Sequence, residues 1–96
     1  MKISFSLFVK KENSPAIGVK FNIDTDCRPV IGDRVNIMEF LNDEQKINLD
    51  VSFLSGTVKS VAWKNVNVGS KINVFTNRID QINEPYLQVE LEQDCP

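Results

Sequence analysis

Apolar and polar residues alternate over much of this 96-residue chain, and a period of two is typical of β-strands with one buried face. The alternation is clearest in two early stretches, residues 3–9 and residues 17–23. Asn13, Ser14 and Pro15 lie in the connection between them, and residues of these types favour turns. We therefore predict an N-terminal β-hairpin.

The middle of the chain is less regular. Gly32 and Asp33 mark a bend at the start of a further strand, in which Val35 and Ile37 would point inward. Residues 47–53 again alternate between apolar and polar positions, which predicts another strand. A polar loop would then join these two strands.

Two interpretations of residues 38–46 stay open. The first is the polar loop. The alternative is one short helix, because Asn42 followed three positions later by Gln45 matches the capping box of a helix N-terminus.

The second half of the chain predicts short strands separated by turns. Ser55 and Gly56 have the composition of a tight two-residue turn. The predicted strands after this turn are residues 57–63, 71–75 and 86–92, with turn-like or irregular connections at residues 64–70 and 77–85 and a frayed end at residues 93–96.

Together these patterns predict a single all-β domain over residues 1–96, a small antiparallel barrel or sandwich of six to eight strands with at most one short helix. An oligonucleotide-binding barrel and an immunoglobulin-like sandwich are alternatives, although the sandwich lacks a Cys-Trp-Cys spacing. The predicted core consists of Ile3, Phe5, Leu7, Val19, Phe21, Val35, Ile37, Leu49, Val51, Val58, Val61, Val74, Leu87 and Val89.

Three stretches carry a resemblance to a known architecture: Pro29-Val-Ile-Gly-Asp-Arg-Val-Asn-Ile, Ser55-Gly-Thr-Val-Lys-Ser-Val-Ala-Trp and Tyr86-Leu-Gln-Val-Glu-Leu-Glu. Their succession resembles the strands of SH3-like small β-barrels, in which a Gly-Asp bend opens one strand, a Gly-led strand follows and a late strand closes the barrel. The chain departs from that pattern by a strand pair before Pro29 and a long insertion between Ile37 and Ser55. The resemblance implies a shape and no particular activity.

The amino-acid composition limits the classes of function that are expected for this chain. The chain is 42 % hydrophobic and 25 % charged, as expected of a globular domain. It contains no histidine, which is the commonest general base and metal ligand, so we predict no enzyme and no cofactor. Cys27 and Cys95 give no disulfide framework, and we expect two reduced thiols.

No targeting or membrane-spanning segment is predicted. The apolar stretch over residues 3–9 is too short for a span and runs directly into Lys10, Lys11 and Glu12. We expect a cytoplasmic protein. Ten Asn residues with abundant Lys and Ile are typical of AT-rich bacterial or phage genomes.

Several polar residues are candidates for chemistry, and each has a structural explanation. Asp24 and Asp26 offer two carboxylates to a divalent ion, but a calcium loop needs more oxygen ligands, so turn capping is expected. Asp33 in the Gly-Asp bend is expected to accept hydrogen bonds from backbone amides. Cys27 would need a base to act as a nucleophile, and none is evident. We predict no metal site and no catalytic residue.

Charge is distributed unevenly in the second half. Residues 51–79 contain basic residues and no acid, whereas residues 80–96 contain acids and no base. One interpretation is a nucleic-acid-binding stripe, in which amines bind phosphates and an aromatic ring stacks on a base. The other is that the two segments form neighbouring strands, with Lys59 facing Glu90 or Glu92. The net charge of −2 favours the second. The stripe would comprise Lys59, Trp63, Lys64, Lys71 and Arg78.

Exposed apolar residues suggest binding to protein. In an extended strand, Met38 and Phe40 would lie on the face opposite Ile37 and Leu41, so they need a cover. Trp63 would anchor an interface if it is exposed. We predict a non-catalytic protein-interaction or self-assembly module that binds a protein partner or copies of itself. The alternative is a nucleic-acid-binding small β-barrel that uses the basic stripe.

Overall fold

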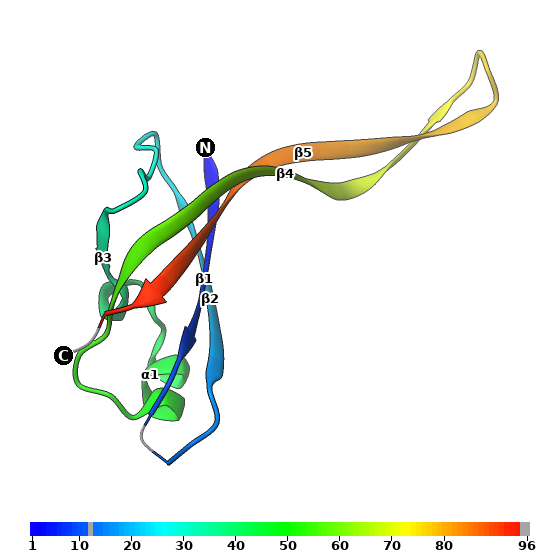
Figure 1. Cartoon of the computed structure of the whole chain (residues 1–96). Helices are drawn as coiled ribbons and strands as arrows, with labels where there is room; N and C mark the ends of the chain where they lie inside the picture. The colour runs from blue at the N-terminus through cyan, green and yellow to red at the C-terminus, as the bar shows by residue number, and fades with distance from the viewer. Residues whose placement is uncertain (12, 95–96) are drawn as a thin grey trace.

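The computed structural model describes residues 1–11 and 13–94 and is mostly β-structure with one short α-helix (Figure 1). Its sheet has five strands in the order β2-β1-β5-β4-β3. The elements are β1 (Lys2–Val9), β2 (Ile17–Asp24), β3 (Arg34–Asn36), a 3-10 helix η1 (Ile37–Phe40), α1 (Asp43–Leu49), β4 (Ser55–Asn73) and β5 (Arg78–Gln93).

The all-β class, the single short α-helix and the N-terminal hairpin are confirmed. β1 and β2 pair antiparallel, with Phe5 opposite Phe21. The sheet differs from the prediction in other respects: it has five strands and not six to eight, β1 pairs parallel with β5, and β2 and β3 remain as edges, so the sheet does not close into a barrel.

A helix replaces the polar loop that was the first interpretation, but it lies at Asp43–Leu49 and not over residues 38–46, and the predicted strand over residues 47–53 is wrong. The Asn42 side chain accepts from the Gln45 amide at 2.8 Å, and the Gln45 side chain accepts from the Asn42 amide at 3.1 Å. α1 then ends at Asp50, which has a left-handed backbone. Leu49 is buried in the core while Ile47 is exposed; in a strand these two side chains would lie on the same face, so the pattern fits a helix and not the predicted strand.

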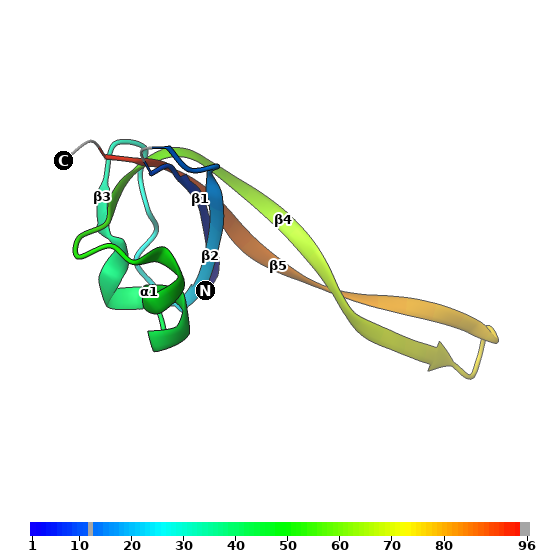
Figure 2. The same cartoon turned by 90° about the horizontal axis from the view of Figure 1, so that it is seen from below.

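α1 and η1 cover one face of the sheet (Figure 2). The Gln45 side-chain amide donates to the Lys20 carbonyl, which ties the helix to β2, and the Ile37 amide donates to the Leu54 carbonyl. Most of the predicted core residues are buried there or pack against the core. Val74 is a wrong prediction, since it is 82 % exposed. The core prediction omitted four residues that are buried: Val9, Leu41, Leu54 and Leu91.

β4 and β5 are much longer than predicted, at 19 and 16 residues. Ser55 and Gly56 form no turn but begin β4, where they pair with β3. The predicted connections at residues 64–70 and 77–85 are strand, apart from Asn77 itself, which ends the turn at residues 74–77. The paired strands leave the body of the domain as a two-stranded ribbon, and the molecule is 59 Å long but only 26 and 20 Å across (Figures 1 and 2).

Candidate interaction surface on the β4–β5 ribbon

Residues 64–86 form the projecting part of the hairpin, which we call the arm. Its root is set by the neighbouring strands: β1 pairs with β5 only as far as Leu87, and β3 pairs with β4 only as far as Thr57. Among the described residues, no strand flanks the arm on either side. The outer backbone amides and carbonyls of both its strands are therefore available to another strand.

The tip of the arm is an ordered turn. The Asn73 side-chain oxygen accepts from the amides of Phe75 at 3.0 Å and Thr76 at 3.4 Å, and Asn77 adopts a left-handed backbone that Asn tolerates well. This turn holds two apolar side chains in solvent, because Val74 is 82 % exposed and Phe75 is 95 % exposed. The tip is thus a fixed apolar projection.

The strand register separates the arm into two faces. Trp63 lies opposite Leu87, which is a core residue. Every second ladder pair from there toward the tip therefore lies on the face of the arm that continues the core face of the sheet. Near the tip, that face carries the pair Ile72 and Ile79. The opposite face carries the pairs Lys64–Tyr86, Val66–Glu84, Gly69–Ile82, Lys71–Asp80 and Asn73–Arg78.

Exposed apolar side chains occur on both faces of the arm and at its tip. An isolated two-stranded ribbon is marginally stable in water, and extended exposed apolar surface usually marks a binding site. If a partner covered only one face of the arm, the apolar residues on the opposite face and at the tip would stay in water. The exposed set comprises Val66, Val68, Ile72, Val74, Phe75, Ile79 and Ile82.

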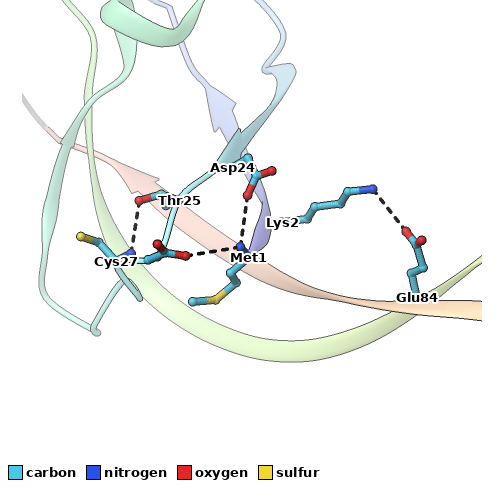
Figure 3. A network of polar contacts seen from close by, with 7 residues as sticks. Met1, Lys2, Asp24, Thr25, Cys27 and Glu84 are labelled. Atoms are coloured by element: carbon cyan, nitrogen blue, oxygen red, sulfur yellow. Dashed lines mark hydrogen bonds and ion pairs between the residues drawn. The ribbon is translucent and has the colours of Figure 1, made fainter.

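The basic and acidic segments are neighbouring strands, as the second interpretation of the charge pattern predicted. Lys71 lies directly opposite Asp80 in the ladder. At the root of the arm, the Lys2 ammonium of β1 contacts the Glu84 carboxylate at 3.2 Å (Figure 3). Lys59 faces neither Glu90 nor Glu92, because it lies in a bulge between two ladder pairs.

The structure does not bring the five residues of the proposed nucleic-acid stripe together. Lys64, Lys71 and Arg78 share one face of the ribbon, interspersed with Glu84 and Asp80. Trp63 lies on the other face, where no lysine or arginine of the arm accompanies it. The Arg28 guanidinium instead lies 6.0 Å from the Trp63 ring centroid, a cation–π distance, and Trp63 is 54 % exposed.

Met38 and Phe40 lie on the body and not on the arm. They belong to η1, so the alternation expected of a strand does not apply. Met38 is half-buried against the core of its own chain. The Phe40 ring stacks on Phe21 with centroids 5.6 Å apart, and Phe21 stacks on Phe5 at 5.0 Å.

The polar residues considered for chemistry make local contacts. The Met1 amino group lies 3.1 Å from an Asp24 oxygen and 4.0 Å from an Asp26 oxygen, and the Cys27 amide donates to the Thr25 hydroxyl (Figure 3). The described residues contain no cluster of three or more metal-ligating side chains. Cys27 is an exposed thiol, and Cys95 lies outside the described residues.

Asp33 behaves as the Gly-Asp bend predicted. Its carboxylate accepts from the Val30 amide at 2.9 Å, and its own amide donates to the Val30 carbonyl at the same distance. The turn that they close leads into β3. Asp33 is therefore a structural residue.

Comparison of this chain with known protein families, with characterised proteins and with solved structures found no match. Over the described residues, the α-helix is too short to cross a bilayer. The uncovered apolar surface of the arm is therefore the main structural indication of a function. Ile72, Ile79 and Ile82 were not among the predicted interaction residues; their apolar character is visible in the sequence, but nothing in the sequence places them on an uncovered ribbon.

Proposed function

We propose that this chain is a non-catalytic protein-interaction module and that the arm is its binding element, for a protein partner or for copies of itself. One observation carries the proposal: the arm adds no residue to the buried core, yet it holds seven large apolar side chains in solvent. The Asn73-capped turn supports it, because a pre-ordered tip loses little entropy on binding.

The proposal includes the absence of catalysis and of a cofactor. The sequence has no histidine, and the polar residues near the root of the arm contact one another or the backbone. We also propose a cytoplasmic location and a resemblance of the body to SH3-like barrels in the succession of its strands. The Gly-Asp bend into β3 and the Gly-led β4 support that resemblance.

The rival proposal is a nucleic-acid-binding arm. The alternation of Lys64, Lys71 and Arg78 with acids disfavours it, since a phosphate backbone would approach carboxylates and amines together. Titration of labelled oligonucleotides should show binding no tighter than the roughly 10⁻⁴ to 10⁻⁶ M of nonspecific contact. Salt-sensitive binding well below a micromolar that is lost in Trp63→Ala would favour this rival.

Photo-crosslinking from two matched positions tests the arm as the binding element. A photoreactive phenylalanine analogue would replace Phe75 at the tip in one variant and Ile47 on α1 in the other. Both native side chains are large, apolar and exposed, but only the first belongs to the arm. The protein would be irradiated both in purified form and in cells that express it.

We expect covalent protein adducts from position 75 and few from position 47. Adducts of the chain with itself and adducts with another protein both support the proposal. Equal labelling from the two positions would show general stickiness and would overturn it. Adducts with nucleic acid alone would also overturn it.

A further inference from the structure

The free edge of β5 at the tip of the arm has a sequence that complements itself. Arg78 and Asp80 lie on the same face of the strand with Ile79 between them on the other face. When two copies of such a strand pair antiparallel about a two-fold axis through Ile79, Arg78 of each copy lies opposite Asp80 of the other. The pairing therefore forms two opposite-charge pairs at once.

We propose that two copies of this chain join through their arm tips, with β5 of one copy paired antiparallel with β5 of the other and Ile79 at the two-fold axis. This inference rests on the proposed function of the arm and names its partner as a second copy. The result is a four-stranded antiparallel sheet at the joined tips, in which residues 78–80 of each β5 pair, because β5 begins at Arg78. Such pairing satisfies edge amides and carbonyls that each arm alone exposes to water.

The apolar residues of the arm support this register. Ile72 lies opposite Ile79 within each arm, so the paired arms place four isoleucines in one row across the four strands. Neighbouring apolar side chains on one face of a sheet stabilise the pairing of the strands. Ile79, which is about two-thirds exposed in one copy, would then lie against Ile79 of the other copy.

The charges on the other face support it as well. Within one arm Lys71 lies opposite Asp80, and the pairing adds Arg78 of the second copy on the outer side of the same Asp80. Each Asp80 is then flanked by one basic residue from each copy. The two-fold axis repeats the Arg78–Asp80 pair, so Arg78 and Asp80 of the two copies together specify both the direction and the register of pairing.

Other antiparallel registers of the same strands are poorer. An axis through Asp80 places the two Asp80 carboxylates opposite each other, and an axis through Ile82 places Asp80 opposite Glu84. An axis through Gln81 places Asp80 opposite Ile82 and Arg78 opposite Glu84, and Glu84 already forms an ion pair with Lys2. Only the register at Ile79 pairs each charge of the tip with its opposite.

The shape of the molecule permits this arrangement. The arm extends away from the body, and antiparallel pairing at the tips sends the two bodies in opposite directions (Figures 1 and 2). The bodies therefore do not clash. Pro85, which lacks an amide hydrogen, lies toward the root and outside the paired segment.

Charge reversal on separate copies tests the register. One variant is Arg78→Asp; the other is the double substitution Lys71→Asp with Asp80→Arg, which keeps an opposite-charge pair within its own arm. In either variant alone, the two-fold pairing would place like charges opposite each other. In a mixture of the two variants, the new acid at position 78 of one copy would lie opposite the new base at position 80 of the other. The native Asp80 of the first copy would then lie opposite the native Arg78 of the second.

Analytical ultracentrifugation over a range of protein concentrations gives the mass of each species. We expect the unmodified chain to form a dimer of twice 10.9 kDa, each variant alone to be monomeric, and the equimolar mixture to form a dimer again. Lys20→Asp, a charge reversal on β2 of the body, is the matched control and should still form a dimer. Circular dichroism of every variant checks that the body stays folded.

Two results would overturn the inference: a monomeric unmodified chain at all concentrations, or dimers that persist in both variants. A mixture that stays monomeric would overturn the register at Ile79. Ile79→Thr, which keeps the strand and removes the apolar row, provides a second test and should also weaken the dimer. If the chain is monomeric but position 75 still crosslinks to another protein, self-pairing fails while the proposed function stands.

Discussion

Ile72 on β4 lies directly opposite Ile79 on β5, and these side chains are 68 % and 67 % exposed to solvent. Cross-strand apolar pairs of this kind usually face a second layer of the same domain. Here no other element of the described chain lies beside them, because the arm has left the body at Tyr86. The pair therefore adds nothing to the core of the body, and under the proposed function it serves binding.

Removal of the arm should leave the body folded. Residues 65–85 would be replaced by Asn-Gly, which favours a tight turn between Lys64 and Tyr86. The lost contacts are outside the core, and the exposed Lys2–Glu84 ion pair is worth at most about 1 kcal/mol. Thermal unfolding at low protein concentration should shift by less than roughly 8 °C. Loss of cooperative unfolding would show instead that the arm is part of the folding unit.

Gly56 should be far less tolerant of a side chain than Gly18. A Cβ at Gly56 would lie 3.1 Å from the Ile37 Cδ1 atom and 3.2 Å from the Leu91 Cβ atom, whereas a Cβ at Gly18 would meet nothing closer than the Phe8 ring at 3.6 Å. We expect Gly56→Ala to lower the free energy of unfolding by about 1 to 3 kcal/mol.

Denaturant titration measures both substitutions. Gly18→Ala is the matched control and should change the free energy of unfolding by less than about 1 kcal/mol. Equal effects of the two substitutions would contradict the close packing between β4, β5 and η1. This packing also explains why a glycine occurs at residue 56 in a strand and not in a turn.

The capping box of α1 should contribute measurably to stability. Asn42→Ala removes the acceptor for the Gln45 amide, which we expect to cost about 1 kcal/mol. Asn48→Ala, on the exposed surface of the same helix, removes an amide of the same size without affecting the cap. Chemical denaturation should show a larger loss for Asn42→Ala, and the reverse order would contradict the assigned cap.

Asp94 should make stability depend on pH in the acid range. The hydroxyl groups of Thr57 and Ser55 donate to its carboxylate at 2.6 and 2.7 Å, and together with the charge of Arg34 they hold the pKa of Asp94 below its ordinary value of 3.8. A lowered pKa means that the folded state favours the ionised form. The stabilisation is therefore complete above the unfolded-state pKa and is lost as the pH falls through the folded-state pKa.

Comparison with Asp94→Asn isolates this contribution. The difference in free energy of unfolding between the native chain and the variant should be constant near neutral pH and should shrink below about pH 4. Thr57→Val removes the closer donor and should reduce the same difference. A difference that stays constant down to about pH 2 would show that the carboxylate charge has no part in tying residue 94 to β4.

The parts of the fold that local patterns determine could be predicted from the sequence. β1 and β2 alternate, apart from Phe8, because one face is buried along most of their length, and Asn42 with Gln45 signals the start of α1. Residues 47–53 show the limit of such patterns. Leu49 and Val51 satisfy a strand period, but the cap and the left-handed Asp50 make the first part of this segment helical.

The arm could not be predicted, because its strands are not shaped by burial. Val66, Val68 and Ile82 do not form one continuous alternating face, and Gly69 and Ser70, which follow Asn67 closely, have the composition of a turn. The bulge between Asn67 and Gly69 also shifts the period. Pro85 is a residue type that usually interrupts strands, yet it is tolerated because the β5 edge is free at that point.

Hydrogen exchange of the arm amides, followed by mass spectrometry at low and high protein concentration, is the sharpest test of the arm as an uncovered binding element. At low concentration, peptides from residues 64–86 should exchange quickly while β1 and the root of β5 stay protected, because the arm has no cover of its own. At high concentration, protection should rise in the arm alone, and most near Ile79. An arm that is already strongly protected at low concentration, or protection that rises on the body and not on the arm, would contradict this role, whereas an arm that exchanges quickly at both concentrations would contradict self-pairing alone.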